Sequence, residues 1–326
     1  MAAPVKVGIV SIGEMGFGIA NLLSAHGYTV MTNITGRSDY TYNRARTANI
    51  RLLDSDEELV KQVDYLFSIV PPRDALATAQ RFMSVKQARK SPLYYVDLNA
   101  ISPRLARHIA AEFKQNVPGI KFVDGGIIGG PPRLKQSSSN EKQASEPEGD
   151  IAATWARPAI PISGPDGLAN ERLAKVLNTI SLGADIGAAS GLKCCYGSLI
   201  KGLLALSIQS FSTAYSMGVY SELHQLLEAF QPRLRNSITK MIVETPPKAG
   251  RWVDEMVEIG RCFGEEGGWD NAGGTQGADV YQRVAEVYRA VAEQTVLGKE
   301  RQEHRVRGTT ADDLAAAVRE GLAEKK

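Results

Sequence analysis

The N-terminal part of the chain passes from an apolar run through a turn of small residues directly into a helical pattern. Residues 5–10 (VKVGIV) are typical of a buried strand, and residues 15–26 carry apolar side chains at helical spacing. Between them lie Ser11, Ile12, Gly13, Glu14, Met15 and Gly16. This strand–turn–helix unit is typical of an α/β fold, and it restricts the fold class more than any other segment.

Strand-like and helical segments then alternate. The strand-like runs are residues 28–33, 64–70, 93–98 and 120–123, and the helical runs are residues 75–82 and 103–113. The alternation predicts a parallel sheet with helices on both faces, as in a doubly wound Rossmann-type domain.

A polar segment interrupts this pattern. Residues 133–149 are rich in Ser, Glu and Lys and nearly free of bulky apolar residues, so we interpret them as a flexible surface insertion. A functional lid is the alternative. Strand-like sequence resumes at residues 151–163, and a helix at 167–180 and a short strand at 184–188 are expected to follow.

The pattern becomes helical from residue 189 to the end. Residues 190–217 form a long, mostly apolar segment that predicts one buried helix, and no strand-like alternation returns after it. Further helices are expected at residues 223–230, 234–244, 251–263, 279–293 and 311–322. We therefore expect a Rossmann-type domain at residues 1–188 and an all-α C-terminal domain at residues 189–326.

Composition argues against several classes of protein. Lys and Arg number 38 and Asp and Glu number 36, a net charge of +2 without a basic stripe, which argues against a nucleic-acid partner. No uncharged apolar run is long enough to span a membrane, and the N-terminus lacks the pattern of a signal peptide. Cys194, Cys195 and Cys262 have neither disulfide-framework nor metal-site spacing, and the acidic residues are too scattered for a metal site. These features favour a cytoplasmic protein.

The turn at residues 11–16 has small residues where a dinucleotide pyrophosphate requires them. Gly13 occupies the middle position, where the backbone approaches the phosphates, and Gly16 the last, where the helix packs against the strand. The first position holds Ser11, the smallest substitute that keeps a Cβ. Free amides and the dipole at the helix N-terminus attract phosphate there. A plain βα turn without a ligand is the alternative.

The end of the second strand indicates which cofactor is bound. NAD-binding sites commonly place Asp or Glu there to hold the ribose hydroxyls, whereas this chain reads Asn33-Ile34-Thr35-Gly36-Arg37-Ser38. Arg37 and Ser38 stand where the 2′-phosphate of NADP would lie, and guanidinium and hydroxyl groups donate well to phosphate. The segment therefore favours NADP over NAD. A solvated arginine in a glycine turn is the alternative.

Several segments together carry a resemblance to a known family. They are residues 12–16, Val70-Pro71-Pro72, residues 97–103 (DLNAISP), residues 124–130 (DGGIIGG) and Gly191-Leu192-Lys193. Their order and spacing resemble the 6-phosphogluconate and β-hydroxyacid dehydrogenase superfamily, which also includes imine reductases. Residues 246–256 resemble a helical domain of a less-characterised subgroup with fungal members. The resemblance covers nearly the whole chain and implies an NADP-dependent oxidoreductase.

The resemblance also implies roles for individual residues. Cofactor binding is implied for the turn residues 11–16, for Asn33, Arg37 and Ser38, for Val70, Pro71 and Pro72, and for Asn99. Ile128, Gly129 and Gly130 correspond to the substrate motif, and Lys193 corresponds to the catalytic lysine.

Two departures from the family bear on the substrate. The substrate-binding serine of the family is Ile128 here, and the His-Asn pair that follows the lysine in the phosphogluconate enzymes is replaced by Tyr196 and Gly197. Phosphogluconate is therefore not expected as the substrate, and a simple hydroxy-carboxylate is disfavoured. Tyr196 shares a helix face with Lys193, and its phenol either donates a proton or orients the substrate; a packing tyrosine is the alternative.

These observations lead to an expected function. Lys193 is expected to give or take a proton as hydride moves between nicotinamide and a small carbonyl or alcohol substrate. The alternatives are an imine reductase, which a cationic lysine would hinder, and an NADPH-binding regulator without catalysis. Lys201 is expected to pair with Glu255 or to meet a substrate anion. A homodimer through the helical domain is expected, because dimers of the family interlock there.

Overall fold

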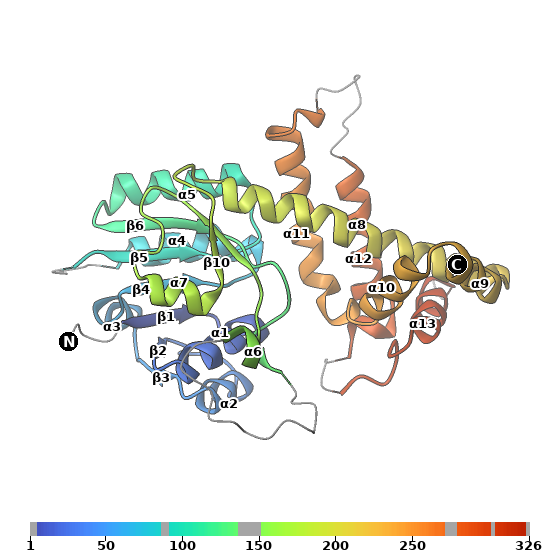
Figure 1. Cartoon of the computed structure of the whole chain (residues 1–326), viewed down its shortest axis with the longest axis horizontal. Coiled ribbons are helices and arrows are strands. Elements are labelled where there is room, and N and C mark those ends of the chain that lie inside the picture. Colours follow the sequence, from blue (N-terminus) through green and yellow to red (C-terminus); the bar gives the residue numbers. More distant parts are fainter. Residues whose placement is uncertain (1–4, 86–90, 136–150, 271–278, 301–303, 324–326) are drawn as a thin grey trace. The chain divides into compact units, whose positions relative to one another are not determined.

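The chain divides into two compact units, Met1–Lys193 and Cys194–Lys326. The structure, a computed structural model, describes residues 5–85, 91–135, 151–270, 279–300 and 304–323 (Figure 1). The division lies inside helix α8 (Ala188–Met217), which begins where the sequence predicts the domain boundary.

The first unit is built on an eight-stranded sheet. Its strands are β1 (Lys6–Val10), β2 (Thr29–Thr32), β3 (Arg51–Leu52), β4 (Tyr65–Ser68), β5 (Leu93–Asp97), β6 (Ile120–Gly125), β9 (Ile160–Ser163) and β10 (Thr179–Ser181), in the order β10-β9-β6-β5-β4-β1-β2-β3 (Figure 1). Neighbouring strands are parallel except β6 and β9. The predicted doubly wound parallel sheet is confirmed.

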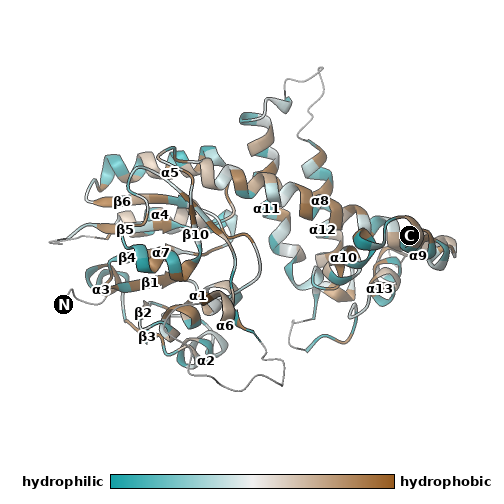
Figure 2. Ribbon diagram, in the orientation of Figure 1, coloured by the Kyte–Doolittle hydropathy of each residue, from teal (hydrophilic) through white to brown (hydrophobic). Residues whose placement is uncertain are grey.

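Helices cover both faces of this sheet. They are α1 (Glu14–Ala25), α2 (Asp39–Thr47), α3 (Asp56–Gln62), α4 (Ala75–Met83), which follows the 3₁₀ turn η1 (Pro72–Asp74), α5 (Pro103–Asn116) and α7 (Glu171–Leu177). Side chains alternate along β4: Tyr65 and Phe67 join the core under α1, α2 and α7, whereas Leu66 joins the core under α3, α4 and α5. A strand buried on both faces is apolar along its length, and the central strands are brown in Figure 2 for this reason.

The segment after β6 differs from its prediction at both ends. Arg133–Leu134 forms strand β7, which pairs antiparallel with β8 (Trp155–Ala156), so the predicted flexible insertion begins with a strand. The rest of that insertion, residues 136–149, lies outside the described residues. Residues 151–154, predicted to be strand-like, form a single helical turn, α6 (Ile151–Thr154).

Two predictions between residues 167 and 188 are wrong. The predicted helix at 167–180 is α7 followed by β10, because Asn178 takes a left-handed conformation (φ 59°) that ends the helix after Leu177. Residues 184–188 are not a strand; Gly183 and Gly187 have positive φ, and the chain turns there into α8.

The second unit is all α-helical in its described part, as predicted. It contains most of α8, then α9 (Tyr220–Phe230), α10 (Pro232–Ile242), α11 (Pro246–Glu265), α12 (Asp279–Gln294), the 3₁₀ turn η3 (Val296–Gly298) and α13 (Ala311–Ala323). Phe211 on α8, Ile259 on α11, Tyr288 on α12 and Leu314 on α13 meet in one apolar core.

Helix α8 is long and apolar enough to cross a membrane by length and composition alone. Its most apolar stretch has a mean hydropathy of 1.3, and 44% of that stretch is buried inside the protein. The core helix of a soluble protein meets the same two criteria, so this property does not distinguish a membrane span from a core helix.

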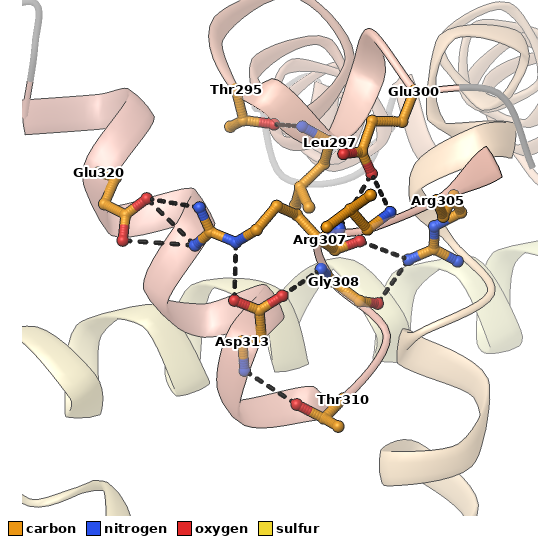
Figure 3. A network of polar contacts seen from close by, with 10 residues as sticks. Thr295, Leu297, Glu300, Arg305, Arg307, Gly308, Thr310, Asp313 and Glu320 are labelled. Atoms are coloured by element: carbon orange, nitrogen blue, oxygen red, sulfur yellow. Dashed lines mark hydrogen bonds and ion pairs between the residues drawn. The ribbon is translucent and has the colours of Figure 1, made fainter.

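A polar network fixes the start of α13 (Figure 3). The side chain of Arg307 pairs with Asp313 (2.8 Å) and with both carboxylate oxygens of Glu320. Asp313 also accepts a hydrogen bond from the backbone of Gly308 (2.5 Å) and donates from its own backbone to the hydroxyl of Thr310 (3.1 Å). Thr310 therefore caps the N-terminus of α13.

Removing this cap should destabilise the second unit. Thr310→Ala leaves the Asp313 amide without its hydroxyl acceptor, and we expect it to lower the free energy of unfolding by about 1 kcal/mol. Thr310→Ser keeps the hydroxyl and serves as the control. Urea unfolding followed by circular dichroism measures the change, and equal midpoints for the alanine and serine variants would contradict the capping role.

Candidate functional site

The turn after β1 keeps its shape despite the serine. Ser11 has a φ of 75°, in the left-handed region that glycine adopts freely. For a residue with a Cβ this conformation costs roughly 1–2 kcal/mol. Ser11 thus takes up the glycine conformation at an energetic cost, and the first glycine of the motif can be replaced without loss of the turn.

The two remaining glycines of the turn are needed for different structural reasons. A Cβ on Gly16 would overlap the backbone carbonyl oxygen of Ser11, so helix α1 packs against the turn only because position 16 has no side chain. A Cβ on Gly13 would meet nothing closer than the Ser11 hydroxyl at 3.9 Å. Gly13 is the N-cap of α1 and no side chain caps that helix, which suits its N-terminus to an anion.

A pocket of about 210 Å³ opens at this turn. It is lined by residues 10–13, by residues 33–35 at the end of β2, and by Arg37, Thr41, Arg44 and Arg81. Its lining contains three arginines and no carboxylate. Uncapped helix amides and guanidinium groups together suit a ligand with several phosphates, and a dinucleotide fits this donor set.

The predicted cofactor residues divide between this pocket and its surroundings. Ser11, Ile12, Gly13, Asn33 and Arg37 line the pocket. Glu14, Met15 and Gly16 form the first turn of α1, and Ser38 is the N-cap of α2, with its hydroxyl 3.3 Å from that of Thr41.

Sequence reasoning missed Thr41, Arg44 and Arg81. The first two lie on α2, a short polar helix that gives no apolar periodicity, and Arg81 lies on α4, far along the chain from the other arginines. Arg44 stacks on the ring of Tyr40, with its guanidinium carbon 4.6 Å from the ring centroid. Thr41 and Arg44 are three residues apart, one helical turn, so two donors at this spacing after β2 are the signal that would have found Arg44.

Asn99 joins the ends of two neighbouring strands. Its side-chain oxygen accepts a hydrogen bond from the backbone of Val70 (2.7 Å), and its amide group donates to the Ser68 hydroxyl (3.0 Å). Its backbone donates to the carboxylate of Asp97 (2.9 Å). Asn99 therefore positions the loop that contains Val70, Pro71 and Pro72, because its side chain is used for that contact.

The start of α8 is anchored by a buried carboxylate. Asp124, at the end of β6, accepts hydrogen bonds from the backbone amides of Gly187 (2.9 Å) and Ser190 (3.2 Å) and from the hydroxyls of Ser163 (2.8 Å) and Ser190 (2.5 Å). Ser163 in turn accepts from the amide of Ala189 (3.1 Å). The carboxylate thus caps α8, where the helix dipole favours a negative charge. Burial raises the pKa of Asp124, and these hydrogen bonds oppose the rise.

This anchor places Lys193 at the end of β6. The ammonium group of Lys193 donates a hydrogen bond to the carbonyl oxygen of Ile127. A Cβ on Gly126 would lie 2.9 Å from the Cβ of Lys193, so the glycine leaves the room in which the lysine side chain lies. Lys193 therefore lies beside the segment 126–130 of the predicted substrate motif.

The remaining predicted substrate residues follow directly. Ile128 is half-buried and exchanges two backbone hydrogen bonds with Ala159, both 2.9 Å long. Gly129 has a φ of 121°, a conformation that a side chain would strain, and Gly130 has open space around it. Tyr196, on α8, is 47% exposed.

Lys201 has a structural partner. Its ammonium group lies 2.6 Å from the carboxylate of Glu255, which also pairs with Arg251 (3.2 Å), and both side chains of the Lys201–Glu255 pair are 9% exposed. Of the two expectations for Lys201, the pairing with Glu255 is confirmed.

The comparisons with known proteins agree with this geometry. Residues 6–139 match the family described as the NAD binding domain of 6-phosphogluconate dehydrogenase. This match to an NAD-binding domain covers the glycine turn, the arginine-lined pocket and strands β1 to β6 of the first unit. Residues 214–291 match a domain of unknown function, DUF1932. The resemblance found in the sequence is thereby confirmed.

Similar proteins extend the match to most of the chain. An uncharacterized 28.5 kDa protein of Methanothermus fervidus is 26% identical over 223 residues, 68% of this chain and 76% of that protein. The 3-hydroxyisobutyrate dehydrogenase of Mycobacterium tuberculosis has a TM-score of 0.57 at 17% identity, over 97% of this chain and 98% of that chain. An imine reductase of Myxococcus stipitatus in complex with NADP+ has a TM-score of 0.50 at 20% identity, over 89% and 93%. At these identities the solved structures show a shared fold.

Substitutions of the two glycines of the NAD-binding turn should have different effects on stability and binding. We expect Gly16→Ala to lower the free energy of unfolding by about 1–3 kcal/mol, because its Cβ overlaps the Ser11 carbonyl. Gly13→Ala should cost less stability but weaken dinucleotide binding about tenfold or more, because its Cβ stands where the pyrophosphate approaches. Urea unfolding and a nicotinamide fluorescence titration separate the two effects, and identical behaviour of the variants would contradict this division of roles.

The raised pKa of Asp97 in the NAD-binding domain predicts that the free energy of unfolding depends on pH. Burial raises its pKa to about 7, against the hydrogen bond from Asn99 and with a contribution from Asp124. Between the ordinary carboxyl pKa and about 7, the folded protein holds a proton that the unfolded chain has lost. Asp97 therefore makes the free energy of unfolding fall as pH rises through this window, by at most about 1.4 kcal/mol per pH unit.

The variant Asp97→Asn cannot ionise and should lose this contribution. We expect the wild-type protein to lose stability relative to the variant as pH rises from about 5 to 8, measured by urea unfolding of both proteins in parallel. A stability difference that does not change with pH would contradict the shifted pKa.

Proposed function

We propose that the protein is an NADP-dependent oxidoreductase that interconverts a small carbonyl compound and the corresponding alcohol, with Lys193 as proton donor and acceptor. One observation carries the proposal: the NAD-binding domain holds an arginine-lined pocket at its glycine turn and a lysine ammonium at the end of β6. Both lie at the carboxyl edge of the parallel strands, where ligands bind in doubly wound folds. A bound nicotinamide dinucleotide supplies the hydride chemistry that side chains cannot.

The charges of the pocket support NADP as the cofactor. Arg37, Arg44 and Arg81 line it together with the hydroxyl of Thr41, and no carboxylate lines it. A 2′-phosphate needs such donors, whereas an NAD site usually offers a carboxylate to the ribose hydroxyls. In this proposal, Ser11–Gly13 and the N-terminus of α1 hold the pyrophosphate, and the arginines hold the additional phosphate.

The position of Lys193 supports its role in proton transfer. An ammonium group has three protons, and the Ile127 carbonyl accepts a hydrogen bond from one of them, which orients the group. In reduction, the carbonyl oxygen of the substrate gains negative charge, which a neighbouring ammonium stabilises and protonates. In oxidation, the neutral amine takes the proton back.

The segment beside the lysine supports a substrate of low polarity. Ile128 presents an apolar side chain where the family places a serine hydroxyl, and Gly129 and Gly130 add no polar side chain. This favours a small ketone or aldehyde over a phosphorylated sugar acid. Imine reduction is the less favoured reaction, because a lysine cation repels an iminium ion.

Substitution of Lys193 tests this function. We expect Lys193→Ala to reduce turnover of carbonyl substrates about 100-fold or more while the Kd for NADPH stays unchanged. Lys193→Arg keeps the positive charge but does not exchange its proton, so it should also be inactive. The assay follows NADPH oxidation with a panel of ketones, aldehydes and cyclic imines.

Two outcomes would contradict the proposal. Turnover of imines that survives Lys193→Ala would point to an imine reductase. NADPH binding without turnover of any compound in the wild-type protein would point to a regulator that senses NADPH.

We also propose that the protein forms a homodimer through α8. Seven residues at alternating spacings of three and four follow one face of the helix: Tyr196, Leu199, Leu203, Leu206, Ser210, Thr213 and Met217. Leu199, Leu206 and Met217 are 74%, 62% and 70% exposed, whereas Leu203 packs partly against the core of the second unit, and none of the seven is charged. This spacing is that of a helix seam that packs against a second helix, and a second copy of the chain offers the same seam.

Charge on this seam should disrupt the dimer. We expect Leu206→Glu to shift the protein towards the monomer in sedimentation velocity, because the carboxylate would be buried against the second copy. Leu226→Glu is the matched control, since Leu226 is 57% exposed but lies on α9, outside the seam. A wild-type protein that sediments only as a 35.2 kDa species would contradict the dimer.

A further inference from the structure

An ion pair lies beside the cofactor pocket and joins helices α3 and α4. Arg81 on α4 lines the pocket, and its Nε lies 2.9 Å from a carboxylate oxygen of Asp56, the first residue of α3. The other carboxylate oxygen of Asp56 accepts a hydrogen bond from the side-chain amide of Asn33 (2.9 Å), just after β2. Asn33 in turn accepts from the backbone (3.1 Å) and the hydroxyl (2.8 Å) of Thr35.

The carboxylate of Asp56 is not used as a helix cap. Ser55 caps α3, with its hydroxyl accepting from the amide of Glu58 (3.1 Å). Asp56 instead faces Asn33 and Arg81, and its side chain is 19% exposed. Its side-chain contacts therefore reach the wall of the pocket.

We propose that the Asp56–Arg81 ion pair sets the preference for NADP over NAD, and this inference rests on the proposed function. Asp56 is an acid that contacts the residue at the end of β2, where NAD sites place a carboxylate. Arg81 neutralises that acid, so the pair as a whole adds no net charge to the pocket. The ion pair thus neutralises the carboxylate of Asp56, which would otherwise repel a 2′-phosphate.

The charge balance of the pocket explains the size of the effect. With the pair intact, Arg81 and Asp56 cancel, and Arg37 and Arg44 face the ligand. Without Arg81, the negative charge of Asp56 stands behind Asn33 and opposes a phosphate. Because both side chains of the pair are partly exposed, Arg81 by 46% and Asp56 by 19%, solvent weakens this repulsion, so the change is moderate rather than complete.

Loss of Arg81 should therefore weaken binding of the 2′-phosphate and leave binding of the rest of the nucleotide little changed. In Arg81→Gln we expect binding of adenosine 2′,5′-bisphosphate to weaken about tenfold, with binding of adenosine 5′-monophosphate little changed. The double variant Arg81→Gln with Asp56→Asn removes both charges and should recover most of the lost preference. Arg81→Lys keeps a positive charge and should stay close to the wild type.

Isothermal titration calorimetry of the full-length protein with both adenosine nucleotides measures the preference, and a thermal transition checks that each variant folds. Arg46→Gln is the matched control, because Arg46 is an exposed arginine on α2 that does not line the pocket. We expect its preference to equal that of the wild type.

The outcomes separate this inference from the function on which it rests. Equal losses for both nucleotides in Arg81→Gln, or no recovery in the double variant, overturn the charge role of the pair while wild-type binding of the bisphosphate upholds the proposed cofactor. A wild-type protein that binds neither adenosine 2′,5′-bisphosphate nor NADPH overturns both.

Discussion

The buried carboxylate of Asp124 connects the sheet to the long helix of this protein. It accepts hydrogen bonds from two backbone amides at the start of α8 and from two serine hydroxyls, and burial raises its pKa against them. Hydrogen bonds to a charged group are worth about 1.5–3 kcal/mol each, so they offset part of the desolvation of the carboxylate. Because the helix starts at this point, Lys193 comes to lie over Gly126 and against the Ile127 carbonyl.

The glycine turn depends on a comparable balance. Ser11 holds a left-handed conformation where helix α1 approaches the turn, with Gly16 against the Ser11 carbonyl. The strain is small relative to the packing of α1 on the sheet, so the turn tolerates the serine. The cofactor pocket and the lysine therefore lie at the same edge of the sheet for one reason, the parallel arrangement of β1, β2 and β6.

Much of this arrangement follows from sequence. The turn at residues 11–16, the strands around it, the long helix and Lys193 all have local signals, either apolar periodicity or small residues at fixed spacing. The short elements α2, β3 and α3 give no such signal because they are polar or very short. The helix predicted at 167–180 was too long because nothing in the apolar pattern announces the left-handed Asn178.

The site was harder to predict than the fold. Arg44 and Arg81 reach one pocket from different helices, and the contact of Asp56 with Asn33 joins residues whose distance in space depends on the sheet order. A sequence pattern places residues on elements, but pairings across elements require the packed structure. The chain has no acid at the end of β2, but the sequence pattern does not reveal that the carboxylate of Asp56 contacts Asn33 at this position.

The most direct test of the proposed cofactor site is a parallel titration of the purified protein with NADPH and NADH, followed by nicotinamide fluorescence. We expect tight binding of NADPH and binding of NADH weaker by about tenfold or more, because the arginine-lined pocket recognises the 2′-phosphate. Binding of neither nucleotide at concentrations on the order of millimolar would contradict it.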